Sequence, residues 1–366
     1  MRRLIIFGLF LFLLVPGRAS AAPLEVSGWI PYWRAATGTV DVIPHMRLFT
    51  SIMPFGYVVQ NDGSIKDAFG LNATSSTSTA AVLVAVAQAS HVRIVPTVMW
   101  SNGAAMDRIL SDGPSRRALE DRIADLAKEG GFDGIDIDFE GKFASTKPYF
   151  SLFLKGLYER MGKKWVYCSI EPRTPPESAF DIVPDKLEYA NDYVAINKYC
   201  DRVTLMTYDQ ASADRYLNHA ASQTPYVPIA DPVWVEKVVN LAAKSIAKKK
   251  LVIGIPTYGY EYDLIPLTQG YRYDMNWALN PSYATTLADE LGLTPVRNIA
   301  GEMSFVYVPT TTPATASTTM RVVWWSDASA IRDKIQLAKK LGVRGVAIFK
   351  LDGGEDRGLW DALRAR

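Results

Sequence analysis

Residues 132–141 read FDGIDIDFEG, and this stretch predicts one buried β-strand with three carboxylates on a single face. Side chains alternate along a strand, so Asp136, Asp138 and Glu140 point one way, while the isoleucines and the phenylalanine between them point the other. Moving carboxylates out of water is costly. Three of them beside an apolar face therefore indicate a functional site rather than a folding device.

The spacing of these acids predicts that they do not all ionise near their ordinary values. Neighbours on one strand face lie roughly 6.8 Å apart. At an effective dielectric of about 20, two ionised carboxylates at that distance repel by about 2.4 kcal/mol. We therefore expect at least one of the three to hold a proton at neutral pH, as a general acid must.

The rest of the chain shows apolar strand-like stretches alternating with helical patterns. The expected strands are 26–33, 49–59, 92–99, 132–141, 165–170, 203–208, 251–256 and 343–351. Eight such strands predict an α/β fold of the (β/α)8 TIM-barrel type, with near-continuous apolar strands because helices cover the sheet. The alternative is an open doubly wound sheet, which usually carries a glycine-rich phosphate turn after its first strand. The sequence has no such turn there.

An excess of sequence separates the seventh strand from its helix. Residues 260–326 contain a helical pattern at 281–291 and two β-rich runs at 303–308 and 320–325, joined by a Thr/Pro/Ala-rich loop. We expect these residues to form a small inserted α+β subdomain with an antiparallel hairpin. The barrel would then comprise residues 24–259 and 327–366.

The N-terminus has the pattern of a secretory signal peptide. Arg2 and Arg3 precede the apolar run 4–15, and Ala19-Ser20-Ala21 provides a cleavage site. A short membrane anchor is the alternative, although the run is too short to span a bilayer comfortably. We therefore expect removal of residues 1–21 and a secreted or extracytoplasmic protein, in the periplasm or cell wall.

The charge of the mature chain limits its partners. Loss of residues 1–21 removes three arginines and no acid, so the formal charge changes from +2 to −1. A near-neutral chain gives no reason to expect nucleic acid or, after signal removal, a membrane as the partner. We expect a monomer.

Cysteine and histidine are scarce. Cys168 and Cys200 lie in or beside apolar runs, which favours two buried thiols over the disulfide that export would permit. His45, His91 and His219 form no close pair, so the sequence offers little material for a zinc site or a Ser-His-Asp triad. No metal or cofactor is expected.

Polar and aromatic residues gather where the predicted strands end, and in a TIM barrel the active site lies at those ends. The residues in these positions are Trp33, Tyr57, Trp100, Glu140, Glu171, Tyr208, Asp209, Tyr258 and Phe349, with Trp325 at the end of the insertion. Aromatic rings stack on the CH faces of sugars, while acids and hydroxyls bond the sugar hydroxyls. The set predicts a carbohydrate site.

The acidic stretch also resembles the DGxDxDxE signature of glycoside hydrolase family 18, the chitinase-like enzymes, at every fixed position. Residues 206–209 (MTYD) resemble the strand-six motif of that family, and residues 254–259 (GIPTYG) resemble its strand-seven motif. Residues 324–327 (WWSD) and 345–356 resemble its final segments. The likeness extends over nearly the whole mature chain.

The resemblance implies a retaining glycosidase that uses substrate assistance instead of a second carboxylate nucleophile. Glu140 would protonate the glycosidic oxygen and later activate water, while the 2-acetamido oxygen of the substrate attacks C1. Asp138 would orient the acetamido N–H, and Asp136 would share a proton or hydrogen bond with Asp138. Tyr208 would donate to the acetamido oxygen.

Asp209 and Met206, from the strand-six motif, are expected to line the same subsite. The implied substrate is a β-1,4-linked polymer that contains N-acetylglucosamine, and both chitin and peptidoglycan strands remain open. Two positions are less expected. Phe349 stands where the family usually has Trp, and Glu171 would be either an extra subsite contact or half of an ion pair with Arg173.

Two other classes of function compete with hydrolysis. The first is a non-catalytic lectin or inhibitor on the same barrel, but such proteins typically lose the terminal acid, and Glu140 is present. The second is a metal-dependent phosphotransferase or nuclease that uses the three acids. No basic phosphate clamp accompanies those acids in the sequence.

Overall fold

A computed structural model describes residues 23–73, 75–221, 224–309 and 320–366. Within it, eight parallel strands close into a barrel in the order β1-β15-β9-β8-β7-β6-β5-β2, and β2 pairs again with β1. Their bounds are β1 Glu25–Pro31, β2 Ser51–Val59, β5 Thr97–Trp100, β6 Gly134–Phe139, β7 Trp165–Ile170, β8 Arg202–Leu205, β9 Leu251–Pro256 and β15 Gly345–Phe349. The predicted TIM barrel is confirmed. The predicted signal peptide lies outside the described residues.

Strands five and seven match their predicted bounds, whereas strands three and six differ for local reasons. Pro96 has no N–H, so the third stretch divides into β4 (Arg93–Ile94), which pairs with β2, and β5. The sixth strand ends at Leu205 because the amides of Thr207 and Tyr208 turn back to the carbonyls two residues earlier, at 2.8 Å each. The residues that follow β8 therefore leave the sheet and project over its end. A short strand, β3 (Ile65–Asp67), extends β2 as an antiparallel hairpin.

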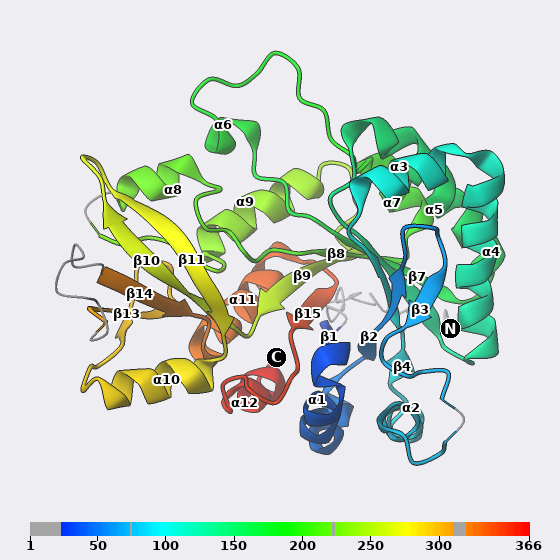
Figure 1. Cartoon of the computed structure of the whole chain (residues 1–366), viewed down its shortest axis with the longest axis horizontal. Helices are drawn as coiled ribbons and strands as arrows, with labels where there is room; N and C mark the ends of the chain where they lie inside the picture. Colours follow the sequence, from blue (N-terminus) through cyan, green and yellow to red (C-terminus); the bar gives the residue numbers. More distant parts are fainter. Residues whose placement is uncertain (1–22, 74, 222–223, 310–319) are drawn as a thin grey trace, which may run out of the picture.

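Helices surround the barrel (Figure 1). They are α1 Ala35–Val42, α2 Thr79–Ala89, α3 Gly103–Ser111, α4 Gly113–Glu129, α5 Lys147–Met161, α6 Pro176–Ala179, α7 Tyr193–Tyr199, α8 Arg215–Ala220, α9 Pro232–Ala242, α11 Ala328–Leu341 and α12 Leu359–Arg364. Three short 3-10 segments span Tyr32–Arg34, Ile43–Leu48 and Ala144–Thr146. Several helices start at an aspartate that accepts from the first-turn amides, including Asp112, Asp231 and Asp327. None of the helices formed by described residues is long and apolar enough to cross a bilayer.

The segment between β9 and α11 folds into a second, five-stranded sheet in the order β11-β10-β14-β13-β12. Its elements are β10 Gly259–Pro266, β11 Tyr271–Leu279, α10 Pro281–Glu290, β12 Val296–Arg297, β13 Met303–Tyr307 and β14 Met320–Trp325. The predicted hairpin is confirmed as the antiparallel pair β13–β14, although residues 310–319 of its loop lie outside the described part. The β10–β11 hairpin was not predicted, although Tyr271, Tyr273, Met275 and Trp277 alternate with polar residues along β11.

The two cysteines form a disulfide, so the prediction of two free thiols was wrong. Cys168 faces outward from β7, and Cys200 ends α7, which brings their Cα atoms to 6.0 Å. Both residues are fully buried, so the apolar context was inferred correctly. Burial alone does not separate thiols from a disulfide, since the packing of α7 against β7 decides the pairing.

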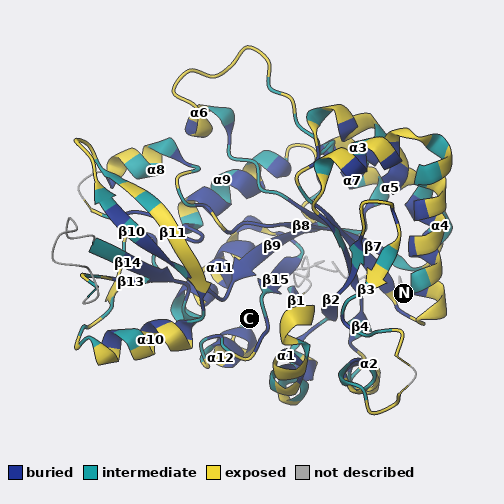
Figure 2. Cartoon of the chain, viewed as in Figure 1, coloured by how far each residue is buried: buried dark blue, intermediate teal, exposed yellow. Residues whose placement is uncertain are grey.

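Figure 2 shows the buried strands of the barrel inside helices whose outer faces are exposed. The interior of the barrel is filled by side chains from several strands, among them Trp29, Met53, Tyr167 and Val252. At the end where the strands begin, Glu25 accepts hydrogen bonds from Arg202 and Arg344. The opposite end is left for the polar and aromatic residues of the site.

Candidate active site

The acidic strand is built as its alternation predicts. Ile135, Ile137 and Phe139 are fully buried in the layer between barrel and helices, where the ring of Phe139 stacks on that of Phe153 in α5 at 5.2 Å. Asp136 and Asp138 take the opposite face and are also buried. The strand therefore directs its carboxylates into the barrel because its apolar side chains fill the outer core.

Asp136 is the deepest of the three acids and is held by three donors. Its Oδ2 accepts from Trp29 Nε1 at 3.2 Å and from Thr97 Oγ1 at 2.9 Å, and its Oδ1 accepts from Ser169 Oγ at 2.9 Å. Burial raises the pKa of Asp136 to about 6, although all three hydrogen bonds act to lower it. No hydrogen bond among the described residues joins Asp136 to Asp138, so the expected direct link between them is not formed here.

Asp138 has the less satisfied environment. Its Oδ1 is buried and has no hydrogen-bond partner among the described residues. Burial raises the pKa of Asp138 well above its ordinary value, and the neighbouring Glu140 and Asp136 add to the effect. A buried oxygen without a donor is costly, so this atom is suited to accept a hydrogen bond from a bound molecule.

Glu140 follows the strand and is the most accessible of the three acids. Its backbone N–H donates to the Trp100 carbonyl at 2.8 Å. Burial raises the pKa of the Glu140 carboxyl, as do Glu171 and Asp209, whereas Lys142 acts to lower it. The geometry therefore places a carboxyl with a raised pKa at the mouth of the barrel.

Tyr208 and Asp209 lie over the barrel on the loop that leaves β8. Asp209 has a positive φ of 57°, and its Oδ1 accepts from the hydroxyls of Tyr258 at 2.6 Å and Tyr260 at 2.8 Å. Burial raises the pKa of Asp209, and these two bonds act to lower it. Met206 is buried beside them. Gly254 allows the close approach, because a Cβ there would lie 2.9 Å from the Tyr208 ring.

Phe349, at the end of β15, lies among other aromatic rings of the site. Its ring is parallel to that of Tyr208 at 5.3 Å and meets the edges of Trp29 and Tyr258, each at 5.9 Å. The peptide bond between Phe349 and Lys350 is cis. The residue that replaces the expected Trp is thus packed on three sides by rings of the site.

The predicted aromatic rim is only partly present. Trp33 is 51% exposed and fits the prediction, but Tyr57, Trp100 and Trp325 are 1 to 2% exposed and offer no open ring face. Tyr57 and Trp100 belong to the outer core, and Trp325 packs with Phe305 between the second sheet and α10. Because side chains alternate, it is Trp324 that faces the barrel side of that sheet. We therefore withdraw these three residues as stacking surfaces.

Among the described residues, Glu171 does not form the expected ion pair with Arg173. Its oxygens accept from the Gly141 N–H and from Asn191 Nδ2, and Lys142 lies 3.5 Å away. Arg173 instead lies over the rings of Tyr189 and Tyr193. Glu171 thus accepts a hydrogen bond from the backbone N–H of the residue that follows Glu140.

Several residues of the site were missed from the sequence. They are Trp29, Thr97 and Ser169 around Asp136, Tyr260 beside Asp209, and Lys142 with Asn191 around Glu171. The first three occupy inward positions of β1, β5 and β7, so strand register could have indicated them. The others depend on loop geometry that gives no sequence signal.

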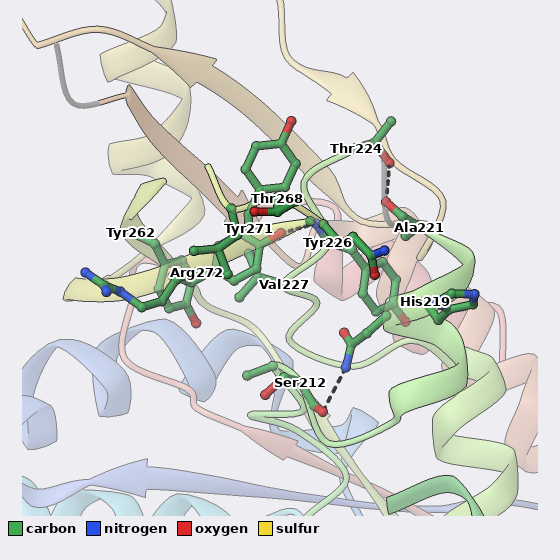
Figure 3. A pocket seen from close by; sticks show the side chains of 16 residues that line it. Ser212, His219, Ala221, Thr224, Tyr226, Val227, Tyr262, Thr268, Tyr271 and Arg272 are labelled. Carbon is green, nitrogen blue, oxygen red and sulfur yellow. Dashed lines mark hydrogen bonds between the residues drawn. The ribbon is translucent and has the colours of Figure 1, made fainter. Parts of the chain in front are cut away.

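Two cavities lie outside the cluster of Asp138, Glu140 and Tyr208, and none of these three residues lines either cavity. One, of about 570 Å³, is lined by Trp33, Trp277, Tyr283, Arg34 and Asp352, among others. The other, of about 790 Å³, lies between the loop after β8 and the β10–β11 hairpin, with Tyr262, Tyr271, Arg272 and His219 on its walls (Figure 3). Both mix aromatic and polar side chains, as sugar sites do. The described residues contain no cluster of three or more His, Cys, Asp or Glu arranged to hold a metal.

Comparison with known proteins gives one family. The model of the glycosyl hydrolases family 18 matches residues 56–354. The chain is 26% identical over 263 residues to an uncharacterized glycosylase, YvbX, of Bacillus subtilis, covering 72% of this chain and 70% of the relative. It is also 26% identical over 246 residues to the cortical fragment-lytic enzyme of the same organism, covering 66% of this chain and 52% of that protein.

Solved structures share the fold. A class V chitinase from Pseudomonas fluorescens superposes with a TM-score of 0.74 at 22% identity, covering 94% of this chain and 99% of that one. The spore cortex-lytic enzyme SleL of Bacillus cereus superposes with a TM-score of 0.71 at 20% identity, covering 93% of this chain and 74% of that one. At these identities the structural likeness supports the architecture alone.

Proposed function

Because the chain belongs to glycosyl hydrolase family 18 and is therefore a glycosidase, we propose that it cleaves β-1,4 linkages next to N-acetylglucosamine by a retaining, substrate-assisted mechanism. In this proposal Glu140 protonates the glycosidic oxygen, and the 2-acetamido oxygen of the substrate attacks C1 as the bond breaks. The resulting oxazolinium ion is opened by a water that Glu140, now ionised, deprotonates. The sugar thus leaves with its original anomeric configuration.

The observation that carries the proposal is the unpartnered Oδ1 of Asp138, on the strand that ends at Glu140. An acetamido N–H is a donor that this oxygen lacks, and the bond would strengthen as positive charge develops on the nitrogen. Asp136 is less suited to this place, because it is fully buried and each of its oxygens already accepts a hydrogen bond. Tyr208 would donate to the oxygen of the same group, and Asp209 would line the same subsite.

The test is hydrolysis of a chromogenic N-acetylglucosamine oligosaccharide by the wild type and by Glu140→Gln. We expect the substitution to remove nearly all turnover, because the amide cannot donate the proton, while the affinity for the sugar persists. Glu129→Gln, at the exposed end of α4, is the matched control and should keep full activity. Equal turnover in wild type and Glu140→Gln would refute the assignment, and sugar binding without hydrolysis by the wild type would favour a lectin.

The natural polymer is proposed to be chitin or a peptidoglycan glycan strand. Product analysis on both materials separates them, since each should release a saccharide with a reducing N-acetylglucosamine end if it is a substrate. Release from neither would confine the activity to another N-acetylglucosaminide.

Export is proposed from the pattern of residues 1–21. The mature protein recovered outside the cytoplasm should begin at Ala22, which N-terminal sequencing would detect. An intact N-terminus on membrane-bound protein would instead support the anchor.

A further inference from the structure

A fully buried lysine lies two residues after Glu140, the proposed proton donor. The Lys142 side chain has no exposed surface, and its ammonium lies 4.8 Å from the Phe150 ring centroid. Burying an ammonium is costly unless it is paired and hydrogen-bonded. Here Nζ donates to the Phe139 carbonyl and lies 3.5 Å from Glu171 Oε2.

Glu171 completes the arrangement from the end of the neighbouring strand. Its Oε1 accepts the Gly141 N–H at 2.9 Å, and its Oε2 accepts from Asn191 Nδ2 at 2.8 Å. The ion pair therefore binds the peptide groups on both sides of Glu140: Lys142 holds the carbonyl before it, and Glu171 holds the N–H after it. Gly141 has a φ of 68°, which allows the chain to turn there.

The pair also sets the charge that faces Glu140. Burial raises the pKa of Glu171, but Lys142, the Asn191 amide and backbone N–H groups outweigh burial and lower it, so Glu171 is ionised. The charged groups that influence Glu140 are then Glu171 and Asp209, which raise its pKa, and Lys142, which lowers it. Asp138, on the same strand, is also affected by Glu140 and Lys142.

We propose that Lys142 and Glu171 are positioning residues for the reaction, and that their ion pair fixes the backbone on both sides of Glu140 and balances the charge it faces. The proposal rests on the assignment of Glu140 as the proton donor. In this proposal Glu171 acts on Glu140 through the backbone and through its charge, instead of contacting the sugar.

The test is the pH profile of kcat/KM for Lys142→Met, Glu171→Gln and the double variant. The alkaline limb reports the group that must be protonated. Without the Lys142 charge, the pKa of Glu140 rises and this limb should move up by about one pH unit. Without the Glu171 charge, it should move down by a similar amount. The double variant should return close to the wild-type limb, and all three should lose about tenfold in kcat because the backbone clamp is weakened.

Lys164→Met is the matched control. Lys164 also donates to a backbone carbonyl, that of Phe132 just before β6. Lys164→Met therefore removes a similar hydrogen bond at a place distant from Glu140. Its pH profile should match that of the wild type. Lys142→Arg, which keeps the charge, should restore the wild-type limb if it folds. Thermal unfolding of each variant shows which proteins are folded. If Lys142→Met does not fold, the test rests on Glu171→Gln, whose side chain is partly exposed.

Three results would overturn the proposal. Unmoved pH limbs in a folded Glu171→Gln variant would show that the pair does not set the charge at Glu140. If the alkaline limb moved in the same direction in Lys142→Met and Glu171→Gln, the two charges would not oppose each other at Glu140. A raised KM with unchanged kcat in Glu171→Gln would make Glu171 a substrate contact. An active Glu140→Gln enzyme would instead refute the proposed function, which keeps the two failures distinct.

Discussion

The ring of Phe349 lies nearly parallel to the ring of Tyr208, with centroids 5.3 Å apart and planes inclined by 16°. This contact joins the end of β15 to the loop after β8 and so couples Phe349 to the residue proposed to bind the acetamido oxygen. Because Trp29 and Tyr258 contact the Phe349 ring on two further sides, this ring is held in place and in turn supports Tyr208.

We predict that Phe349→Leu lowers kcat/KM for the chromogenic substrate. Leu conserves apolar character, but it loses the ring contact, which is worth about 0.5–1.5 kcal/mol. The expected loss is about twofold to thirteenfold. Phe305→Leu is the matched control, because its ring meets Trp325 at 6.0 Å in the core of the second sheet. It should lower the Tm and leave kcat/KM unchanged, so an equal loss of kcat/KM in both variants would contradict the prediction.

The sequence predicted the features that depend on alternation within one strand. The opposite faces of Asp136 and Ile137 follow from a period of two, and the barrel follows from the repeat of strand and helix. Where two adjacent residues are alike, as in Trp324-Trp325, the pattern does not indicate which one faces the barrel, and the structure places Trp324 there instead of the predicted Trp325.

Features made by distant segments could not be predicted in this way. Glu171 and Asn191 meet Lys142 only after β7 and the loop before α7 are placed. The disulfide likewise depends on how the end of α7 packs on β7. Such contacts arise from the arrangement of elements, and no local pattern encodes them.

We predict that Glu25 stabilises the fold above its ordinary pKa. Burial raises the pKa of Glu25, but Arg202 and Arg344 outweigh it and lower the value from 4.5 to about 2. A carboxylate whose folded pKa is depressed contributes stability above the unfolded value and loses it as pH falls through the folded one. The contribution of about 3 kcal/mol should therefore disappear between pH 4.5 and pH 2, as urea unfolding at several pH values would measure.

Glu25→Gln should flatten the pH dependence of the free energy of unfolding within that window. Glu188→Gln is the control, because Glu188 pairs with Lys186 on the surface, and such pairs contribute little. A Glu25→Gln protein with the wild-type slope would rule out this role for Glu25.

We predict that Glu302 fastens the second sheet to the barrel. Its fully buried carboxylate accepts from the amides of Ile229 and Ala230, from Trp324 Nε1 and from Lys334 in α11. Glu302→Ala leaves the buried Lys334 ammonium unpaired and should lower the free energy of unfolding by about 3–5 kcal/mol. Adding Lys334→Met to that variant should recover part of the loss in urea unfolding, and a purely additive double variant would contradict the coupling.

We predict that the disulfide contributes to stability through the loop it closes. Cys168 and Cys200 are 32 residues apart, and a loop of that length restricts the unfolded chain by about 3–4 kcal/mol. Cys168→Ala with Cys200→Ala should therefore lower the free energy of unfolding by up to about that amount, because two small buried side chains leave the packing of α7 on β7 largely intact. Dithiothreitol should destabilise the wild type to a similar extent and leave the double variant unaffected. Equal sensitivity of both proteins to the reductant would show that its effect does not act through this bond.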